Sequence, residues 1–70
     1  MKLIVHVTDI RKAKGLTQAD LAKLANVSRK TINTIENNVF VPSTILALTL
    51  AKVLDVSVHK LFELPDTDSH

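Results

Sequence analysis

The fold is decided by residues 15–37, whose sequence is GLTQADLAKLANVSRKTINTIEN. Thr17 and Asp20 have the spacing of a capping box, so a helix is expected to begin here. Asn26 tolerates the left-handed conformation that ends a helix, and Ser28 can cap a second helix. Two helices joined by three residues are therefore predicted, which is the arrangement of a helix-turn-helix.

Three further short helices are predicted, one before this stretch and two after it. Thr8, Ser43 and Ser57 each stand where a hydroxyl can cap the start of one of them. The sequence therefore predicts an all-α domain of five helices over residues 1–64, followed by a disordered tail over residues 65–70.

Apolar residues recur in these helices at the spacing of a buried face. Those expected in the core are Leu21, Ala22, Leu24, Ala25, Ile32, Ile35, Leu46, Ala47, Leu50, Ala51, Leu54, Val58, Leu61 and Phe62. Residues 2–7 instead alternate in the manner of a short strand.

Composition excludes several kinds of site. The chain has no cysteine, which rules out disulfides and thiolate metal sites. No apolar run reaches the roughly 18 residues of a membrane span, and polar residues follow the first apolar ones too soon for a signal peptide. His6, His59 and His70 lack the spacing of metal ligands, and no phosphate-binding loop or nucleophile elbow is present. We therefore expect a cytoplasmic protein that is not an enzyme and has no metal or cofactor.

Charge is distributed unevenly although the formal net charge is only +2. Residues 1–35 carry seven basic and two acidic side chains, whereas residues 36–70 carry two basic and five acidic ones. A basic half beside an acidic half is typical of a protein with one face for a polyanion. The alternative interpretation is an ordinary solvated charged surface.

The motifs, in this order and at this spacing, resemble the phage Cro and repressor type of helix-turn-helix family. The resemblance rests on residues 15–22, 27–32, 35–37, 42–43, 46–47 and 61–62. It implies a lambda-repressor-like domain that binds double-stranded DNA as a transcriptional repressor, with a recognition helix over residues 29–37 in the major groove. Small members of the family pair their chain ends, which implies two short antiparallel strands from residues 2–5 and 61–64.

The resemblance also implies roles for individual residues. The positions that match base-reading residues are Arg29, Lys30, Asn33 and Thr34. The positions assigned to phosphate contacts are Gln18, Ser28, Thr31 and Asn37. Arg and Lys can donate to guanine O6 and N7, and Asn can bond adenine N6 and N7. The alternative for these residues is an ordinary polar helix surface.

Arg11 and Glu36 match positions that form an ion pair in some family members. Such a pair would tie the first helix to the end of the recognition helix. The alternative is that Arg11 binds a phosphate.

Operators of this family are usually palindromes read by two-fold dimers. The last two helices carry apolar residues beyond those needed for the core. We expect a homodimer interface formed by Ile45, Thr49, Val53, Val56 and Val58. The alternatives are a fuller core in a monomer or, for function, an antitoxin or DNA-binding subunit that acts with a protein partner.

Overall fold

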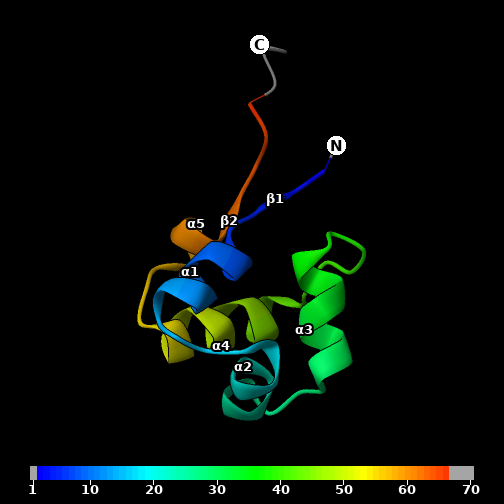
Figure 1. The fold of residues 1–70 in the computed structure, drawn as a ribbon. Coiled ribbons are helices and arrows are strands. Elements are labelled where there is room, and N and C mark those ends of the chain that lie inside the picture. Colours follow the sequence, from blue (N-terminus) through cyan, green and yellow to red (C-terminus); the bar gives the residue numbers. More distant parts are fainter. Residues whose placement is uncertain (1, 67–70) are drawn as a thin grey trace.

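The computed structural model describes residues 2–66, in which five helices surround one core and two short strands close it (Figure 1). The elements are β1 (Ile4–Val5), α1 (Val7–Ala13), α2 (Gln18–Ala25), α3 (Arg29–Glu36), α4 (Thr44–Leu54), α5 (Val58–Leu61) and β2 (Phe62–Glu63). The predicted fold class is confirmed, including the short sheet.

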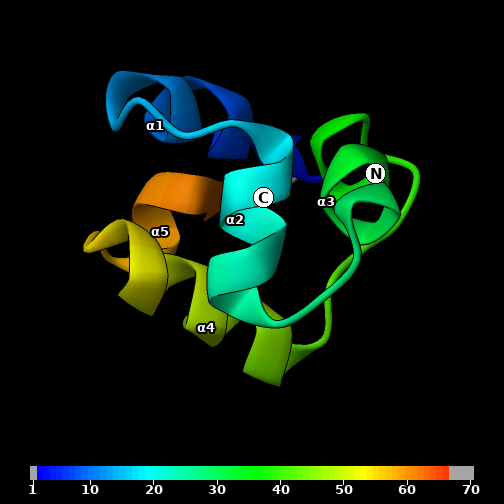
Figure 2. The ribbon, with the colours of Figure 1, turned by 60° about the horizontal axis from the view of Figure 1, so that its bottom comes forward.

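Helix α2 lies at the centre of the arrangement (Figure 2). It contacts α3 and α4, and α4 contacts α5. Helix α3 therefore stands at one side of the body, and α1 and α5 stand at the other (Figures 1 and 2). This arrangement leaves one long face of α3 free of other elements.

The core is apolar and tightly closed. Its fully buried side chains are Val7, Leu21, Ile32, Ile35, Leu50, Leu54 and Leu61. Two expectations were wrong. Leu24 is 54% exposed, because α2 turns only three of its residues, Leu21, Ala22 and Ala25, into the core. Phe62 lies in β2 and not in α5, because the chain becomes extended after Leu61.

Helix starts follow the predicted capping residues with two exceptions. The capping box is present: the Asp20 N–H donates to Thr17 Oγ1 at 3.0 Å, and the Thr17 N–H donates to Asp20 Oδ2 at 2.9 Å. Ser28 and Ser43 accept the expected bonds, each at 3.1 Å. Ser57 precedes α5, but its side chain makes no cap hydrogen bond.

The second exception is the start of α1. The prediction that Thr8 caps this helix was wrong, because α1 begins at Val7 and Thr8 is already helical. The His6 N–H donates to the carbonyl of Leu61 at 2.8 Å. This bond to the end of α5 fixes the backbone just before α1, so the helix begins without a side-chain cap.

Four of the helices, α1 to α4, are followed within two residues by a residue in the left-handed conformation, whereas α5 continues into an extended strand. Gly15, Asn26, Asn38 and Asp55 have φ angles of 73°, 60°, 62° and 58°. Asn tolerates this conformation better than most residues because its short side chain bonds locally. The predicted turn at Asn26, which sets the angle between α2 and α3, is confirmed.

Strands β1 and β2 pair antiparallel, with Ile4 opposite Glu63 and Val5 opposite Phe62. An exposed contact of 2.6 Å between His6 Nε2 and Glu63 Oε1 continues the pairing. The predicted pairing of the two chain ends is confirmed, although β1 is shorter than the alternating segment because Val7 begins α1.

The expected tail falls partly within the structure. Pro65 and Asp66 have no regular secondary structure, and residues 67–70 lie outside the described residues. Within residues 2–66, no helix is long and apolar enough to cross a membrane.

Candidate nucleic-acid interface

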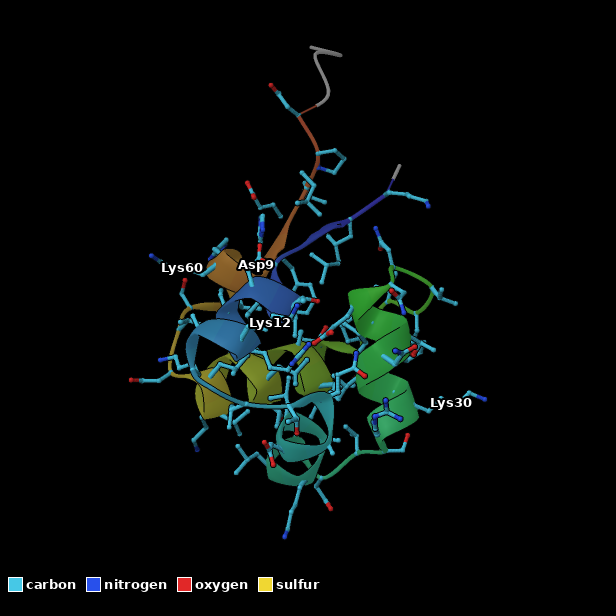
Figure 3. All side chains as sticks on the ribbon, in the orientation of Figure 1. Asp9, Lys12, Lys30 and Lys60 are labelled. Carbon is cyan, nitrogen blue, oxygen red and sulfur yellow. The ribbon has the colours of Figure 1, made fainter. Side chains whose placement is uncertain are left out.

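Helix α3 presents a polar face outward because its apolar residues point inward. Ile32 and Ile35 are fully buried. Arg29, Lys30 and Asn33 are exposed. Lys30 projects from α3 on the side of the molecule away from Lys60 on α5 (Figure 3). These three polar side chains thus lie on the face of the helix that is free of other elements.

Glu36, at the end of α3, is held by a buried ion pair. Arg11 Nε donates to Glu36 Oε2 at 2.7 Å, and Arg11 Nη2 donates to Glu36 Oε1 at 3.1 Å. The third nitrogen, Nη1, donates to the carbonyl of Leu16 at 2.9 Å. The two side chains are only 9% and 5% exposed. Arg11 was expected either to pair with Glu36 or to bind phosphate. All three of its guanidinium nitrogens donate to partners within the protein.

Both members of this pair are charged at neutral pH. Burial alone would raise the pKa of Glu36, but hydrogen bonds from Arg11, Gln18 and Thr8 and the charge of Arg11 lower the pKa below its ordinary value. The hydrogen bond to Glu36 raises the pKa of Arg11 further, against the effect of burial. A bidentate charged pair of this kind fixes the relative orientation of the two elements that it joins.

Gln18 links this pair to the outward face of α3. Its Nε2 donates to Glu36 Oε1 at 3.0 Å, and its Oε1 accepts a long bond of 3.4 Å from Asn33 Nδ2. Asn33 Oδ1 in turn accepts from Asn37 Nδ2 at 3.1 Å. Gln18, Asn33 and Asn37, which the sequence assigns to DNA, therefore form one hydrogen-bonded row from α2 to the end of α3.

The hydroxyl groups on α3 are occupied within the helix. Ser28 Oγ and Thr31 Oγ1 lie 2.9 Å apart, and Thr34 Oγ1 donates to the carbonyl of Thr31 at 2.9 Å. Thr31 and Thr34 are half-buried. These predicted site residues share one flank of α3, on which their polar atoms already have partners.

A hollow on this flank is lined in part by two loop residues, Val39 and Phe40, from which the sequence predicted only backbone N–H contacts to phosphate and no role for the side chains. The loop after α3 folds back, so the N–H groups of Val39 and Phe40 both donate to the carbonyl of Thr34, at 2.9 and 3.2 Å. The hollow has a volume of about 340 Å³ and is lined by Ser28, Lys30, Thr31, Thr34, Val39 and Phe40. We call it the α3 hollow. The signal in the sequence was a run of three apolar residues, 39–41, where a loop is expected.

The loop is also bonded to Leu3, the residue just before β1. Asn38 Nδ2 donates to the carbonyl of Leu3 at 2.7 Å. No local pattern indicates this bond, because the two residues are 35 positions apart. It holds the start of the loop, and with it one wall of the α3 hollow, against the chain end.

The residues expected at a dimer interface differ in exposure. Ile45 is 79% exposed, whereas Thr49, Val53, Val56 and Val58 are half-buried. The three valines pack against the core. Leu48, which shares the outer face of α4 with Ile45, is 54% exposed. Helix α4 thus presents two large apolar side chains to solvent in this single chain.

Among residues 2–66, no group of three or more His, Asp or Glu side chains is placed to hold a metal ion. The chemistry of the face described above is that of hydrogen-bond donors, acceptors and positive charge.

Comparison with known proteins identifies related regulators. The helix-turn-helix family matches residues 7–61. An uncharacterized HTH-type transcriptional regulator of Methanocaldococcus jannaschii is 41% identical over 58 residues, which cover 83% of this chain and 88% of that protein. The solved structure of the restriction-modification controller protein C.AhdI from Aeromonas hydrophila has a TM-score of 0.76 at 34% identity, covering 80% of this chain and 85% of that chain.

SinR from Bacillus subtilis is a further structural relative. Its N-terminal DNA-binding domain has a TM-score of 0.72 at 34% identity, covering 91% of this chain and 90% of that chain. SinR, a master regulator for biofilm formation, has also been solved in complex with DNA and in a complex with the SinI protein, each with a TM-score of 0.71 at 37% identity. Those two matches cover 76% of this chain, with 86% and 52% of the respective SinR chains.

Proposed function

The chain belongs to the helix-turn-helix family of DNA-binding transcription regulators, and from this premise we propose that it is a repressor that reads a palindromic operator as a homodimer. The observation that carries the proposal is the outward face of α3. Arg29, Lys30 and Asn33 are exposed there, while Ile32 and Ile35 anchor the helix behind them. A helix of this kind fits the major groove, where base pairs present distinct hydrogen-bond patterns.

Each polar residue of this face has a proposed role. Arg29 and Lys30 donate to guanine O6 and N7, and Asn33 bonds adenine N6 and N7. Thr34, half-buried beside them, contacts a base edge through its side chain. Because Asn33 is bonded to Gln18 and Asn37, its amide is held in place before DNA arrives.

Phosphate contacts are proposed for residues at the margins of the face. Gln18 is the first residue of α2, where backbone N–H groups and the helix dipole favour an anion. Asn37 follows α3, and Ser28 and Thr31 lie at its start. Such contacts fix the register of the protein on DNA but carry no sequence information themselves.

A homodimer supplies the second recognition helix that a palindrome needs, with half-sites about 34 Å apart. The support is the apolar outer face of α4, where Ile45 and Leu48 are exposed. We propose that this face and the neighbouring Thr49, Val53, Val56 and Val58 form a self-complementary interface. The structural similarity to C.AhdI, a restriction-modification controller protein, and to SinR, a regulator solved in complex with DNA, supports the regulatory role.

The experiment is a selection of binding sites from a random duplex library by the purified wild-type chain. We expect enrichment of a sequence with two inverted half-sites. Asn33→Ala and Lys30→Ala are expected to lose about tenfold or more in affinity and to relax preference at one position each. Asn37→Ala is expected to weaken binding to all sequences about equally.

The matched control is Lys60→Ala, which removes an exposed lysine from α5, on the other side of the molecule from α3 (Figure 3). It is expected to leave the preferred sequence and the affinity nearly unchanged. Enrichment of single half-sites alone would contradict the palindromic operator. A selected site placed over a promoter is expected to lower reporter transcription when the chain is present, and higher transcription would contradict repression.

A second candidate function is that of an antitoxin or a DNA-binding subunit that works with another protein. The SinR complex with the SinI protein favours it, because a relative with this fold is solved with a protein bound. DNA binding that requires the co-expressed product of an adjacent gene would support this second function. Binding by the purified chain alone supports the first.

A further inference from the structure

The α3 hollow has an apolar lining on a face that is otherwise polar. Val39 is 77% exposed and Phe40 is 46% exposed, and both lie beside the proposed base readers. The segment from Asn38 to Val41 contains no basic residue, so its side chains have no positive charge with which to attract phosphate. Contacts to phosphate therefore do not account for apolar side chains in this position, whereas contact with an apolar group would.

The hydroxyl groups that line the hollow already have hydrogen-bond partners. Thr34 Oγ1 donates to the carbonyl of Thr31, and Thr31 Oγ1 lies within hydrogen-bond distance of Ser28 Oγ. Each of these threonines also carries a γ-methyl group, so it can offer hydrocarbon to a ligand as well as its hydroxyl. Together with Val39 and Phe40 they make a receptor for an apolar group.

Hydrogen bonds within the chain hold the hollow in shape. The N–H groups of Val39 and Phe40 bond the carbonyl of Thr34, and the side chain of Asn38 bonds the carbonyl of Leu3. A wall fixed at three points loses little conformational freedom when a ligand enters.

We propose that the α3 hollow receives the 5-methyl group of a thymine in each half-site, and that Val39 and Phe40 are residues that determine sequence specificity. The inference rests on the proposed DNA-binding function. The thymine methyl is the apolar feature that base edges present in the major groove. Continuity with the proposed DNA interface supports this occupant, because Lys30 and Thr34 line the hollow and are also proposed base-reading residues.

The experiment removes the methyl group and nothing else. A site is first selected with the wild-type chain from a synthetic library without methylated cytosine, so thymine is the one source of a C5 methyl. Each thymine of the selected site is then replaced in turn by uracil. At one position per half-site we expect affinity to fall about fourfold, the factor that corresponds to burial of one methyl group.

The protein side of the test uses Val39→Ala and Phe40→Ala. Both variants are expected to bind the thymine and uracil sites with nearly equal affinity at the sensitive position. Val41→Ala is the matched control, because Val41 is 67% exposed in the same loop but does not line the α3 hollow. It is expected to keep the fourfold preference. Thermal melting of each variant confirms that it is folded.

The outcomes separate the inference from the function on which it rests. A selected site at which no uracil weakens binding would overturn the inference and leave the proposed function intact. The inference is also overturned, with the proposed function intact, if Val39→Ala and Phe40→Ala keep the full preference for thymine. It is likewise overturned if these variants lose dimerisation and not the preference for thymine. A library that yields no enriched sequence would overturn the proposed function, and the inference with it.

Discussion

Glu36 is the residue at which three helices meet. Its carboxylate accepts hydrogen bonds from Arg11 on α1 and Gln18 on α2, and it ends α3 itself. The orientation of α3 relative to α1 and α2 therefore depends in part on this buried charge. Removal of a single partner from a buried pair leaves the other charge uncompensated, which costs more than the pair contributes.

We expect Glu36→Ala to lower the free energy of unfolding by about 3 kcal/mol. The control is Glu63→Ala, which removes a half-exposed carboxylate from its contact with His6 and is expected to cost less than about 1 kcal/mol. Urea denaturation followed by circular dichroism measures both. Equal losses in the free energy of unfolding would contradict the prediction, because the buried pair would then stabilise the fold no more than the exposed contact does. An unchanged operator preference in folded Glu36→Ala would agree with a purely structural role for Glu36.

The same carboxylate makes stability depend on pH in the acid range. The pKa of Glu36 is lower in the folded chain than in the unfolded chain, so its charged form stabilises the fold. This contribution is complete above the ordinary pKa of Glu and is lost as the pH falls through the lower folded-state pKa.

We therefore expect the free energy of unfolding to fall more steeply on acidification in the wild-type chain than in Glu36→Gln. Urea titrations at successive pH values measure the two slopes. The pKa of Asp20 is also lowered, by its hydrogen bonds with Thr17, and contributes with the same sign in both proteins. The difference between the slopes thus isolates Glu36, and identical slopes would contradict the prediction.

At the scale of single residues, the sequence predicts an individual ion pair better than a network of side-chain hydrogen bonds. Arg11 and Glu36 could be matched because the resemblance indicates the two positions together. The bonds from Gln18 to Glu36 and Asn33 depend on how closely α2 crosses α3, which no local pattern specifies.

Among the helices, the serine caps offer a controlled comparison. Ser43 accepts a hydrogen bond from the N–H of Leu46 at the start of α4, whereas Ser57 stands in the corresponding place before α5 without such a bond. The sequence predicts a helix cap at both serines, but in the structure only Ser43 makes the capping hydrogen bond.

Ser43→Ala is expected to lower the free energy of unfolding by about 1 kcal/mol, the usual effect of losing a helix cap. Ser57→Ala should stay within about 0.5 kcal/mol of the wild type, as is usual for surface substitutions. Thermal melting of the two variants side by side provides the comparison. A larger loss for Ser57→Ala than for Ser43→Ala would mean that the cap bond does not govern these helix starts.

Helix boundaries could be predicted where the signals are local. The capping box at Thr17 and the turn at Asn26 lie within a few residues of the backbone that they control. The start of α1 could not be predicted in this way, because the bond from His6 to Leu61 bridges the two ends of the chain.

At the scale of the whole molecule, two leucines on different helices are equally exposed to solvent, although only Leu24 was expected in the core. Leu24 on α2 and Leu48 on α4 are each 54% exposed. Both follow apolar neighbours at helical spacing, yet the crossing of the helices leaves each in solvent. Exposure depends on the packed arrangement of all five helices, so composition and periodicity do not determine it.

If the outer face of α4 forms the proposed dimer interface, Leu48→Glu will weaken self-association by tenfold or more, because a charge would be buried without a partner. Leu24→Glu makes the same chemical change at equal exposure on another face and is expected to leave self-association unchanged. Sedimentation equilibrium of the two variants and the wild type measures the difference. A wild-type chain that stays monomeric at tens of micromolar would contradict the dimer itself.

The pairing of β1 with β2 also has a consequence for the order of events in folding. Ile4 meets Glu63 only after nearly the whole chain has been closed into a loop, whereas α2 and α3 are neighbours in sequence. Closure of such a long loop has an entropic cost, and the few contacts between two short strands offset that cost only after the rest of the chain has folded. We expect the strands to join last and to open first, so that the amide of His6, bonded to Leu61, exchanges its hydrogen sooner than those of the helical core. Because Asn38 is bonded to Leu3, each such opening would briefly release the loop that follows α3.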